Sequence, residues 1–254
     1  MAIVSIKELL EAGVHYGHRT SRWNPKMDRF IFGKRNSIHI IDLRETIRGL
    51  VKATRFLRAV RAHNEWVLLV GTKRQAAQTV KAEAMRLAQP YVTSRWLGGS
   101  LTNFQTIRQR LARLEELEAM EQSGQMRLFS KKMISSLQRQ KRRILRNLEG
   151  IRTMHRLPGA VVVFDPRRER NAVHEANILG IPIVALLDTD SDPDLIDIPI
   201  PGNDDALRSI QLVVGVLGRS LEEGTMIAGE AAKAQQPPTP QPQPPEPSAE
   251  PAPQ

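Results

Sequence analysis

The residues best suited to chemistry lie between positions 13 and 36, where positive charges are interleaved with aromatic rings. The cations of this segment are Arg19, Arg22, Lys26, Arg29, Lys34 and Arg35. Trp23 and three further aromatic residues lie among them, although aromatic residues form only 4% of the chain. Guanidinium and ammonium groups neutralise phosphates, and flat rings stack on unpaired bases. The segment therefore favours a nucleic-acid surface, and a loop anchored to the core by its rings is the alternative.

A second candidate chemistry is phosphate binding by the turn Gly71-Thr72-Lys73, which follows an apolar run. A phosphate-cradling loop needs the spacing G-x-x-x-x-G-K-[ST], and the turn lacks it. No G-x-G-x-x-G sequence occurs either, so the glycines at positions 98 and 99 are better explained by tight turns. We expect no nucleotide cofactor.

A third candidate is an acidic cluster, with four aspartates between positions 188 and 194 and a pair at positions 204 and 205. Carboxylates can hold a hard cation, but the spacing differs from that of an EF-hand loop. Helix caps and Asx turns explain the same residues more simply. We therefore assign no metal site. If a cation were bound here, its candidate ligands would be His18, Asp188, Asp204 and Asp205.

The composition limits the remaining classes of function. The chain has 254 residues, 41% of them hydrophobic, and a net charge of +10, which favours a polyanionic partner. Cysteine is absent, which excludes disulfides and thiolate metal sites. No serine lies in a nucleophile elbow, so we expect no catalytic residue. The chain has no apolar run of membrane-spanning length and no secretory signal pattern, so we expect a cytoplasmic protein without a membrane partner.

Apolar strands alternate with helices along most of the chain. The expected strands are 37–43, 66–70, 92–94, 160–164 and 181–187, and the expected longer helices are 43–62, 75–88, 171–179 and 205–221. This alternation predicts an α/β fold with a doubly wound parallel sheet of about five strands. The segment 13–36 has neither a helical nor a strand period, so we expect it to be irregular.

Residues 102–154 contain no strand signal and read as an insertion of two amphipathic helices, broken at Gly124. They predict a projecting antiparallel helical hairpin between two parts of the α/β domain, residues 1–101 and 155–229. The second arm has ten cations and one acid, Glu149, which favours contact with a polyanion. Residues 230–254 are rich in proline, and we expect a disordered tail.

Many ordered segments of this chain, up to about residue 229, match one known family. They include Gly13-Val14-His15-Tyr16-Gly17-His18, Trp23-Asn24-Pro25-Lys26-Met27, Val70-Gly71-Thr72-Lys73, Arg95-Trp96-Leu97-Gly98-Gly99, Leu101-Thr102-Asn103-Phe104, Asp165-Pro166-Arg167 and Ile200-Pro201-Gly202-Asn203-Asp204-Asp205-Ala206. The chain thus resembles the bacterial small-subunit ribosomal protein S2 family. The second hairpin arm is more basic than is usual in that family, and the proline-rich tail is an addition to it.

The resemblance implies a flavodoxin-like fold and a non-enzymatic structural role in the small ribosomal subunit. It implies binding to 16S ribosomal RNA between head and body on the solvent side. The implied partners are neighbouring small-subunit proteins, including the large mRNA-binding one that the family helps to recruit, and no second copy of the chain. A nucleotide-binding enzyme on the same fold and a free RNA-binding regulator remain the alternatives.

Within this interpretation, the segment 13–36 and three loops that follow strands supply the candidate RNA contacts. They are Arg19, Arg22, Trp23, Asn24, Lys26, Arg29, Lys34, Arg35, Lys73, Arg74, Arg95, Trp96 and Asn103. We expect Trp23 to point toward the domain and Arg22 to point toward solvent, so that rings anchor the segment while cations meet phosphates.

Overall fold

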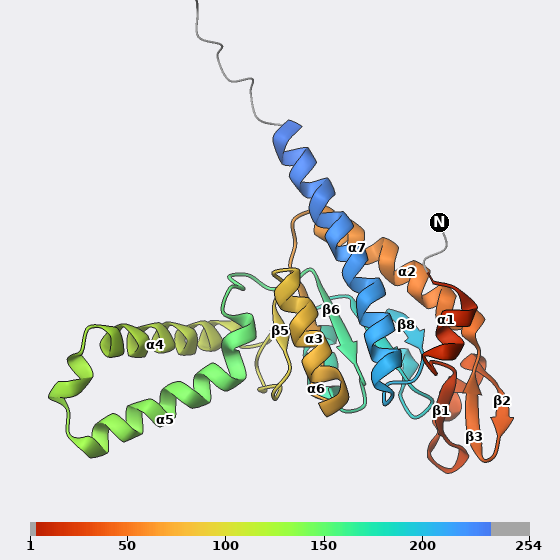
Figure 1. Ribbon diagram of the computed structural model, residues 1–254, viewed down its shortest axis with the longest axis horizontal. Coiled ribbons are helices and arrows are strands. Elements are labelled where there is room, and N and C mark those ends of the chain that lie inside the picture. Colours follow the sequence, from red (N-terminus) through yellow and green to blue (C-terminus); the bar gives the residue numbers. More distant parts are fainter. Residues whose placement is uncertain (1–3, 235–254) are drawn as a thin grey trace, which may run out of the picture.

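A five-stranded parallel sheet forms the centre of the protein, and the computed structural model describes residues 4–234 (Figure 1). Its strands are β4 (Val67–Val70), β5 (Tyr91–Val92), β6 (Ala160–Phe164), β7 (Ile183–Leu187) and β8 (Ile198–Pro201), in the spatial order β5-β4-β6-β7-β8. Strands β4, β6 and β7 are buried along their whole length, as expected for parallel strands covered on both faces. The predicted doubly wound α/β fold with about five strands is confirmed.

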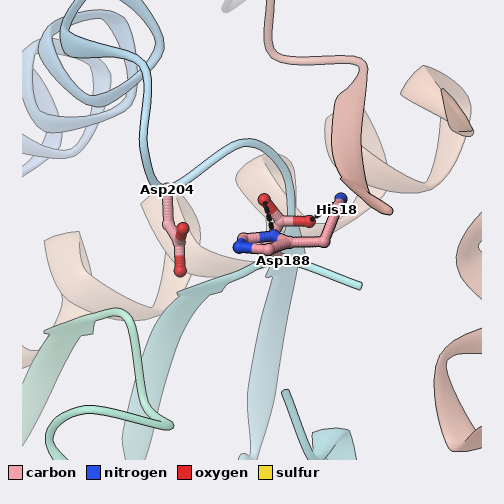
Figure 2. A group of neighbouring side chains, drawn as sticks. All are labelled: His18, Asp188 and Asp204. Carbon is pink, nitrogen blue, oxygen red and sulfur yellow. Dashed lines mark hydrogen bonds and ion pairs between the residues drawn. The ribbon is translucent and has the colours of Figure 1, made fainter. Parts of the chain in front are cut away.

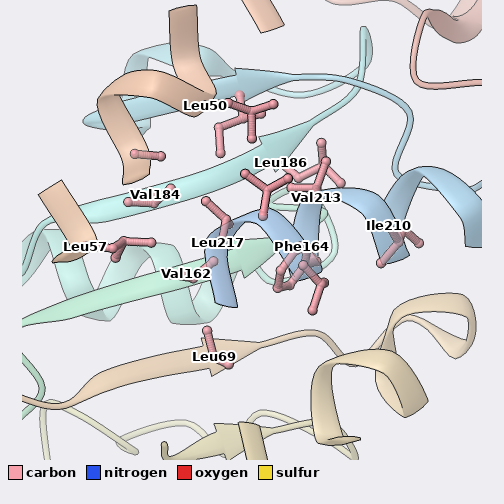
Figure 3. Packing of buried hydrophobic residues seen from close by; sticks show 14 of the residues in the cluster. Leu50, Leu57, Leu69, Val162, Phe164, Val184, Leu186, Ile210, Val213 and Leu217 are labelled. Carbon is pink, nitrogen blue, oxygen red and sulfur yellow. The ribbon is translucent and has the colours of Figure 1, made fainter. Parts of the chain in front are cut away.

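Helices cover both faces of this sheet because successive strand residues point to opposite sides. On one face, α2 (Leu43–Ala62), α3 (Arg74–Arg86) and α7 (Leu207–Ala234) pack together with the short α1 (Ile6–Glu11). On the other face, α6 (Arg170–Ile178) and the base of the helical hairpin contribute to a second core. Figure 3 shows the first of these cores, in which α2 and α7 side chains meet the sheet.

Gly49 lets α2 approach the edge strand β8 closely. A Cβ atom at this position would collide with the carbonyl oxygen of Pro199 and lie 3.1 Å from the Cα of Ile200. We expect Gly49→Ala to lower the free energy of unfolding by about 1–3 kcal/mol, measured by urea denaturation, because the backbone of β8 must move. The higher helix propensity of alanine, taken alone, would instead raise the free energy of unfolding by up to about 1 kcal/mol.

Gly215 in α7 is the matched control, because a Cβ atom there would meet no described atom within 4 Å. Gly215→Ala is therefore expected to be neutral or stabilising. Equal responses of the two variants would contradict the close approach of α2 to β8.

The segment predicted to be irregular instead forms part of a separate antiparallel sheet, which corrects the sequence interpretation. This sheet consists of β1 (Tyr16–Arg19), β2 (Ile31–Arg35) and β3 (Ile38–Ile41), with β3 in the middle. Two 3-10 turns, η1 (Thr20–Arg22) and η2 (Pro25–Phe30), connect β1 to β2. The strand predicted at 37–43 therefore exists, but it does not belong to the parallel sheet; the fifth parallel strand is β8, which the sequence interpretation missed.

The irregular pairing of β1 and β2 with β3 explains why the sequence pattern did not predict β1 and β2. The register shifts between Tyr16 and Arg19 in β1 and between Ile31 and Gly33 in β2, so the alternation of apolar and polar residues is lost. The sequence still carried one signal. Asn36 and Ser37 form the two-residue loop between β2 and β3, both with positive φ (49° and 61°), as in a type I′ hairpin turn.

The helices α4 (Phe104–Gln122) and α5 (Lys131–Leu148) lie side by side and extend away from the sheet (Figure 1). They are joined by Gly124, with φ of 76°, and by η3 (Gln125–Leu128), and η4 (Glu149–Ile151) follows α5. The apolar stripe of α4 at Ile107, Leu111, Leu114 and Leu117 is buried. The boundaries 102 and 154 of this unit stay a prediction.

The last described element, α7, runs to Ala234, so its helix continues past residue 230, where the tail was predicted to start. Residues 235–254 of the predicted tail lie outside the described residues. Between residues 4 and 234, no helix combines the length and apolar character needed to cross a membrane.

Candidate nucleic-acid interface

The loops that follow four parallel strands bring charged side chains together at the carboxyl ends of the strands, as this topology requires. Lys73 follows β4, Asp165 follows β6, Asp188 follows β7, and Asp204 and Asp205 follow β8. The ammonium group of Lys73 lies 2.7 Å from Asp204 and 2.6 Å from Asp205, with Asp165 at 3.4 Å. We call these five residues the strand-end cluster. Because three carboxylates already pair with Lys73, this lysine is not available to a nucleotide phosphate.

His18 connects the antiparallel sheet to the strand-end cluster (Figure 2). Its Nδ1 atom lies 2.9 Å from Asp188, and its backbone N–H donates to Asp188 and to the hydroxyl of Thr189. The hydrogen bond to Asp188 raises the pKa of His18 to about 9, despite partial burial. A protonated His18 is therefore an ion-pair partner at neutral pH.

The carboxyl group of Asp204 is almost completely buried. Burial raises its pKa to about 7, repulsion from Asp165 and Asp188 acts in the same direction, and Lys73 offsets only part of the shift. Burial would lower the pKa of Lys73, but the neighbouring carboxylates outweigh burial and raise it. The cluster is thus an interdependent set of charges in which each member needs its partners.

Three of the four candidate metal ligands meet at these strand ends. His18, Asp188 and Asp204 each place one ligand atom within 4.8 Å of the others, and Asp205 lies 3.5 Å from Nε2 of His18. Metal binding would require His18 to lose its proton. In the described arrangement, protonated His18 and Lys73 supply the positive charge that a cation would bring, and we assign no metal.

The antiparallel sheet and its turns present cations to solvent. Five are exposed and form no ion pair within residues 4–234, and we call them the free cations: Arg19, Arg22, Arg29, Lys34 and Arg35. Arg19 and Arg35 both pair in register with Ile38, from the two sides of β3. Since residues directly opposite each other share a face of the sheet, these two arginines project from the same face.

The other predicted contacts of this segment hold it in place. Trp23 is half-buried and its ring lies 5.0 Å from the ring of His39, whereas Arg22 is exposed. The backbone N–H of Asn24 donates to the carbonyl of Thr189, at 2.7 Å, and its side chain caps η2. Lys26 pairs with Asp192 and Asp194, at 2.9 and 2.8 Å, so its charge is already compensated.

The remaining predicted contacts divide between core and surface. Trp96 is buried, with 7% of its area exposed, and its indole N–H donates to Glu175, so its ring is covered by the core. Arg74, Arg95 and Asn103 are exposed. The sequence interpretation missed Glu175, and no spacing rule links it to Trp96, which lies 79 positions away.

The hairpin carries a second group of cations. Lys141 of α5 pairs with Glu121 of α4. Arg152, which follows α5, pairs with Glu118 of α4 at 2.7 Å. The other described cations of α5 are exposed and form no ion pair with a described residue: Lys131, Lys132, Arg139, Arg142, Arg143 and Arg146. Arg110 of α4 joins Arg139 and Arg143 around a groove of about 530 Å³, and no carboxylate among residues 4–234 lines it.

Comparison with known proteins gives one consistent result. The family described as Ribosomal protein S2 matches residues 9–224. A small ribosomal subunit protein uS2 from Rhodopirellula baltica is 55% identical over 224 residues, covering 88% of this chain and 86% of that protein. The uS2 protein of Mycobacterium tuberculosis is 51% identical over 238 residues, covering 94% and 83%. The uS2c protein of Cyanophora paradoxa is 52% identical over 225 residues, covering 89% and 97%.

Proposed function

The chain belongs to the ribosomal protein S2 family and is therefore a structural component of the small ribosomal subunit rather than an enzyme, and we propose that it binds 16S ribosomal RNA through its free cations. The observation that carries the proposal is a group of exposed cations on a sheet that is itself fixed to the domain, and these cations form no ion pair with any residue between positions 4 and 234. Cations without acidic partners gain most from phosphates, because binding releases the counterions of the RNA.

The fixed position of the sheet supports this proposal. Backbone N–H groups of His18 and Asn24 bond to residues 188 and 189, and Trp23 packs on His39. A surface held in advance loses less conformational freedom on binding than a flexible loop does. The proposed contacts are the free cations, with Arg74, Arg95 and Asn103 as further exposed candidates; Trp23, Asn24, Lys26, Lys73 and Trp96 then hold these contacts in place.

The finer placement in the subunit follows from the family resemblance alone. We propose a position between head and body on the solvent side, next to other small-subunit proteins. The neighbours would include the large mRNA-binding ribosomal protein, which this chain would help to recruit. No second copy of the chain is part of the proposed assembly.

Sedimentation of a cell extract at low magnesium tests the proposed function. We expect the chain to migrate with small ribosomal subunits and to be released by high salt, because phosphate contacts weaken as salt rises. Recovery only in the soluble fraction would favour a free RNA-binding regulator. Tight nucleotide binding in calorimetry, without subunit association, would favour the enzyme alternative.

The hairpin groove lined by Arg110, Arg139 and Arg143 supports a second RNA contact. We expect replacement of Arg139 and Arg143 by Ala to lower the slope of log K against log salt by about 1.4–1.8, or about 0.7–0.9 for each lost phosphate contact. Binding of a 16S fragment measured over a salt series gives this slope. Lys141→Ala is the control, because Glu121 already compensates Lys141; an equal effect of both changes would remove the groove from the interface.

A further inference from the structure

Glu175 is a buried carboxylate of α6 that receives five hydrogen bonds from one loop. One oxygen accepts from the indole N–H of Trp96 and the backbone N–H of Gly99, both at 2.9 Å. The other accepts from the backbone N–H of Leu101, at 3.0 Å, and from the N–H and hydroxyl of Thr102, both at 3.3 Å. A single side chain therefore satisfies donors of four different residues in this loop.

The loop has little regular structure of its own. It joins β5 to α4 and contains Gly99, whose φ of +84° lies in the left-handed region. Buried N–H groups outside helices and sheets need an acceptor, and here the acceptor comes from a different helix. The conformation of the loop therefore depends on Glu175 rather than on the loop sequence alone.

The charge of Glu175 strengthens this attachment. Burial by itself would raise the pKa of Glu175, but the hydrogen bonds from Trp96, Leu101, Gly99 and Thr102 outweigh burial and lower it. The group is thus ionised at neutral pH, and hydrogen bonds to a carboxylate are stronger than those to a neutral acceptor. A lowered pKa also means that this stabilisation is present above the pKa of the unfolded chain and is lost as the pH falls through the folded-state value.

The loop carries exposed groups at both ends. Arg95 lies near its start and Asn103 ends it as the residue before α4, and both side chains are exposed. The backbone N–H of Asn103 bonds to the carbonyl of Gly99, at 3.0 Å, so the start of α4 is tied to the same loop. Fixing the loop therefore contributes to the direction in which the hairpin leaves the sheet, together with the packing of Ile107 and Leu148 in the core.

We propose that Glu175 is a positioning residue for RNA binding, holding residues 95–103 so that Arg95, Asn103 and the hairpin meet the RNA in one arrangement. Glu175 does not contact RNA, since it is buried beneath the loop. The proposal rests on the proposed binding of 16S ribosomal RNA, and it adds that the hairpin is oriented by a charge on the sheet domain.

The variant Glu175→Gln tests this role at nearly constant volume. One carboxylate oxygen becomes an NH₂ group that must face N–H donors, so at least two of the five hydrogen bonds are replaced by repulsion. We expect amide hydrogen exchange at residues 96–102 to increase by about tenfold or more, and the indole N–H of Trp96 to exchange faster in NMR spectra. Affinity for a 16S fragment should fall by about fivefold.

The pH dependence separates positioning from general loss of structure. In the wild-type chain, the protection factors of the loop amides, corrected for the intrinsic pH dependence of exchange, should fall as acid protonates Glu175, whereas Glu175→Gln should lack this acid transition. Glu169→Gln is the matched control. Glu169 is also buried and accepts from the N–H and hydroxyl of Thr72 in another loop, so its loss should accelerate exchange at Thr72 and leave residues 96–102 unchanged.

The possible outcomes test different parts of the proposal. Faster loop exchange with unchanged RNA affinity would overturn the positioning role while leaving RNA binding itself intact. Unchanged loop exchange would overturn the attachment. Failure of the wild-type chain to bind the fragment would instead overturn the proposed function. If Glu175→Gln fails to fold, Trp96→Phe removes one donor and keeps an aromatic ring, and the proposal then requires a smaller change in exchange and affinity in the same directions.

Discussion

Replacing Arg19, Arg22, Arg29 and Arg35 together by Ala should weaken binding to a 16S fragment by about tenfold or more, or about 1.4 kcal/mol. Each of these side chains is exposed and lacks an acidic partner within the described residues, so each is free to neutralise a phosphate. The magnitude of the slope of log K against log salt should fall by about three, because each of the four lost phosphate contacts contributes about 0.7–0.9 to it. Fluorescence anisotropy over a salt series measures both quantities.

Lys26→Ala is the internal control for this prediction. Lys26 lies in the same segment and carries the same charge, but Asp192 and Asp194 already hold it. Its removal should leave the salt slope nearly unchanged. A quadruple variant with a wild-type slope would exclude the antiparallel sheet from the RNA interface, whatever its effect on folding.

Lys73→Met should lower the free energy of unfolding by about 3–5 kcal/mol, because it leaves buried carboxylates without their cation. Asp204 is almost fully buried and Asp165 lies 3.4 Å from the ammonium group, so water cannot replace the lost charge completely. Domains of this kind are stable by only about 5–15 kcal/mol, so the loss would be large. Urea denaturation at neutral pH measures it.

The double variant Lys73→Met with Asp204→Asn should recover part of this loss, because the amide carries no charge to be left unpaired. Stability of Lys73→Met alone should improve toward acid pH, where Asp204 takes up a proton. If the single variant is as stable as the wild type, the strand-end cluster is not a structural centre of the domain.

The parallel sheet could be predicted from the sequence wherever a strand is buried on both faces. The runs at 66–70, 160–164 and 181–187 are continuously apolar, and they correspond to β4, β6 and β7. Strand β8 was missed because Pro199 and Pro201 interrupt its pattern. An edge strand tolerates proline, since one side of its backbone needs no donor, and β8 lies at the edge of the sheet.

The sequence predicted which residue types form the candidate site, but not which of its cations form ion pairs with acidic residues. Charge and aromatic content indicated the segment 13–36, yet nothing in that segment distinguishes Lys26 from Arg29. Only the fold shows that Lys26 meets Asp192, which lies 166 positions away, while Arg29 meets no described acid. The same reason hid Glu175, whose role depends on a loop brought to α6 by the sheet.

A backbone hydrogen bond and an ion pair join His18 to Asp188, 170 positions later in the chain. The two residues are therefore synthesised at different times. During synthesis at about 5–20 residues per second, the segment that carries the free cations precedes its anchoring loop by about 10–30 s. Until residues 188 and 189 emerge, the antiparallel sheet has no place to dock. If the free cations bind RNA as proposed, incomplete chains lack an assembled RNA-binding surface, and only a nearly finished molecule can compete for its place in the subunit.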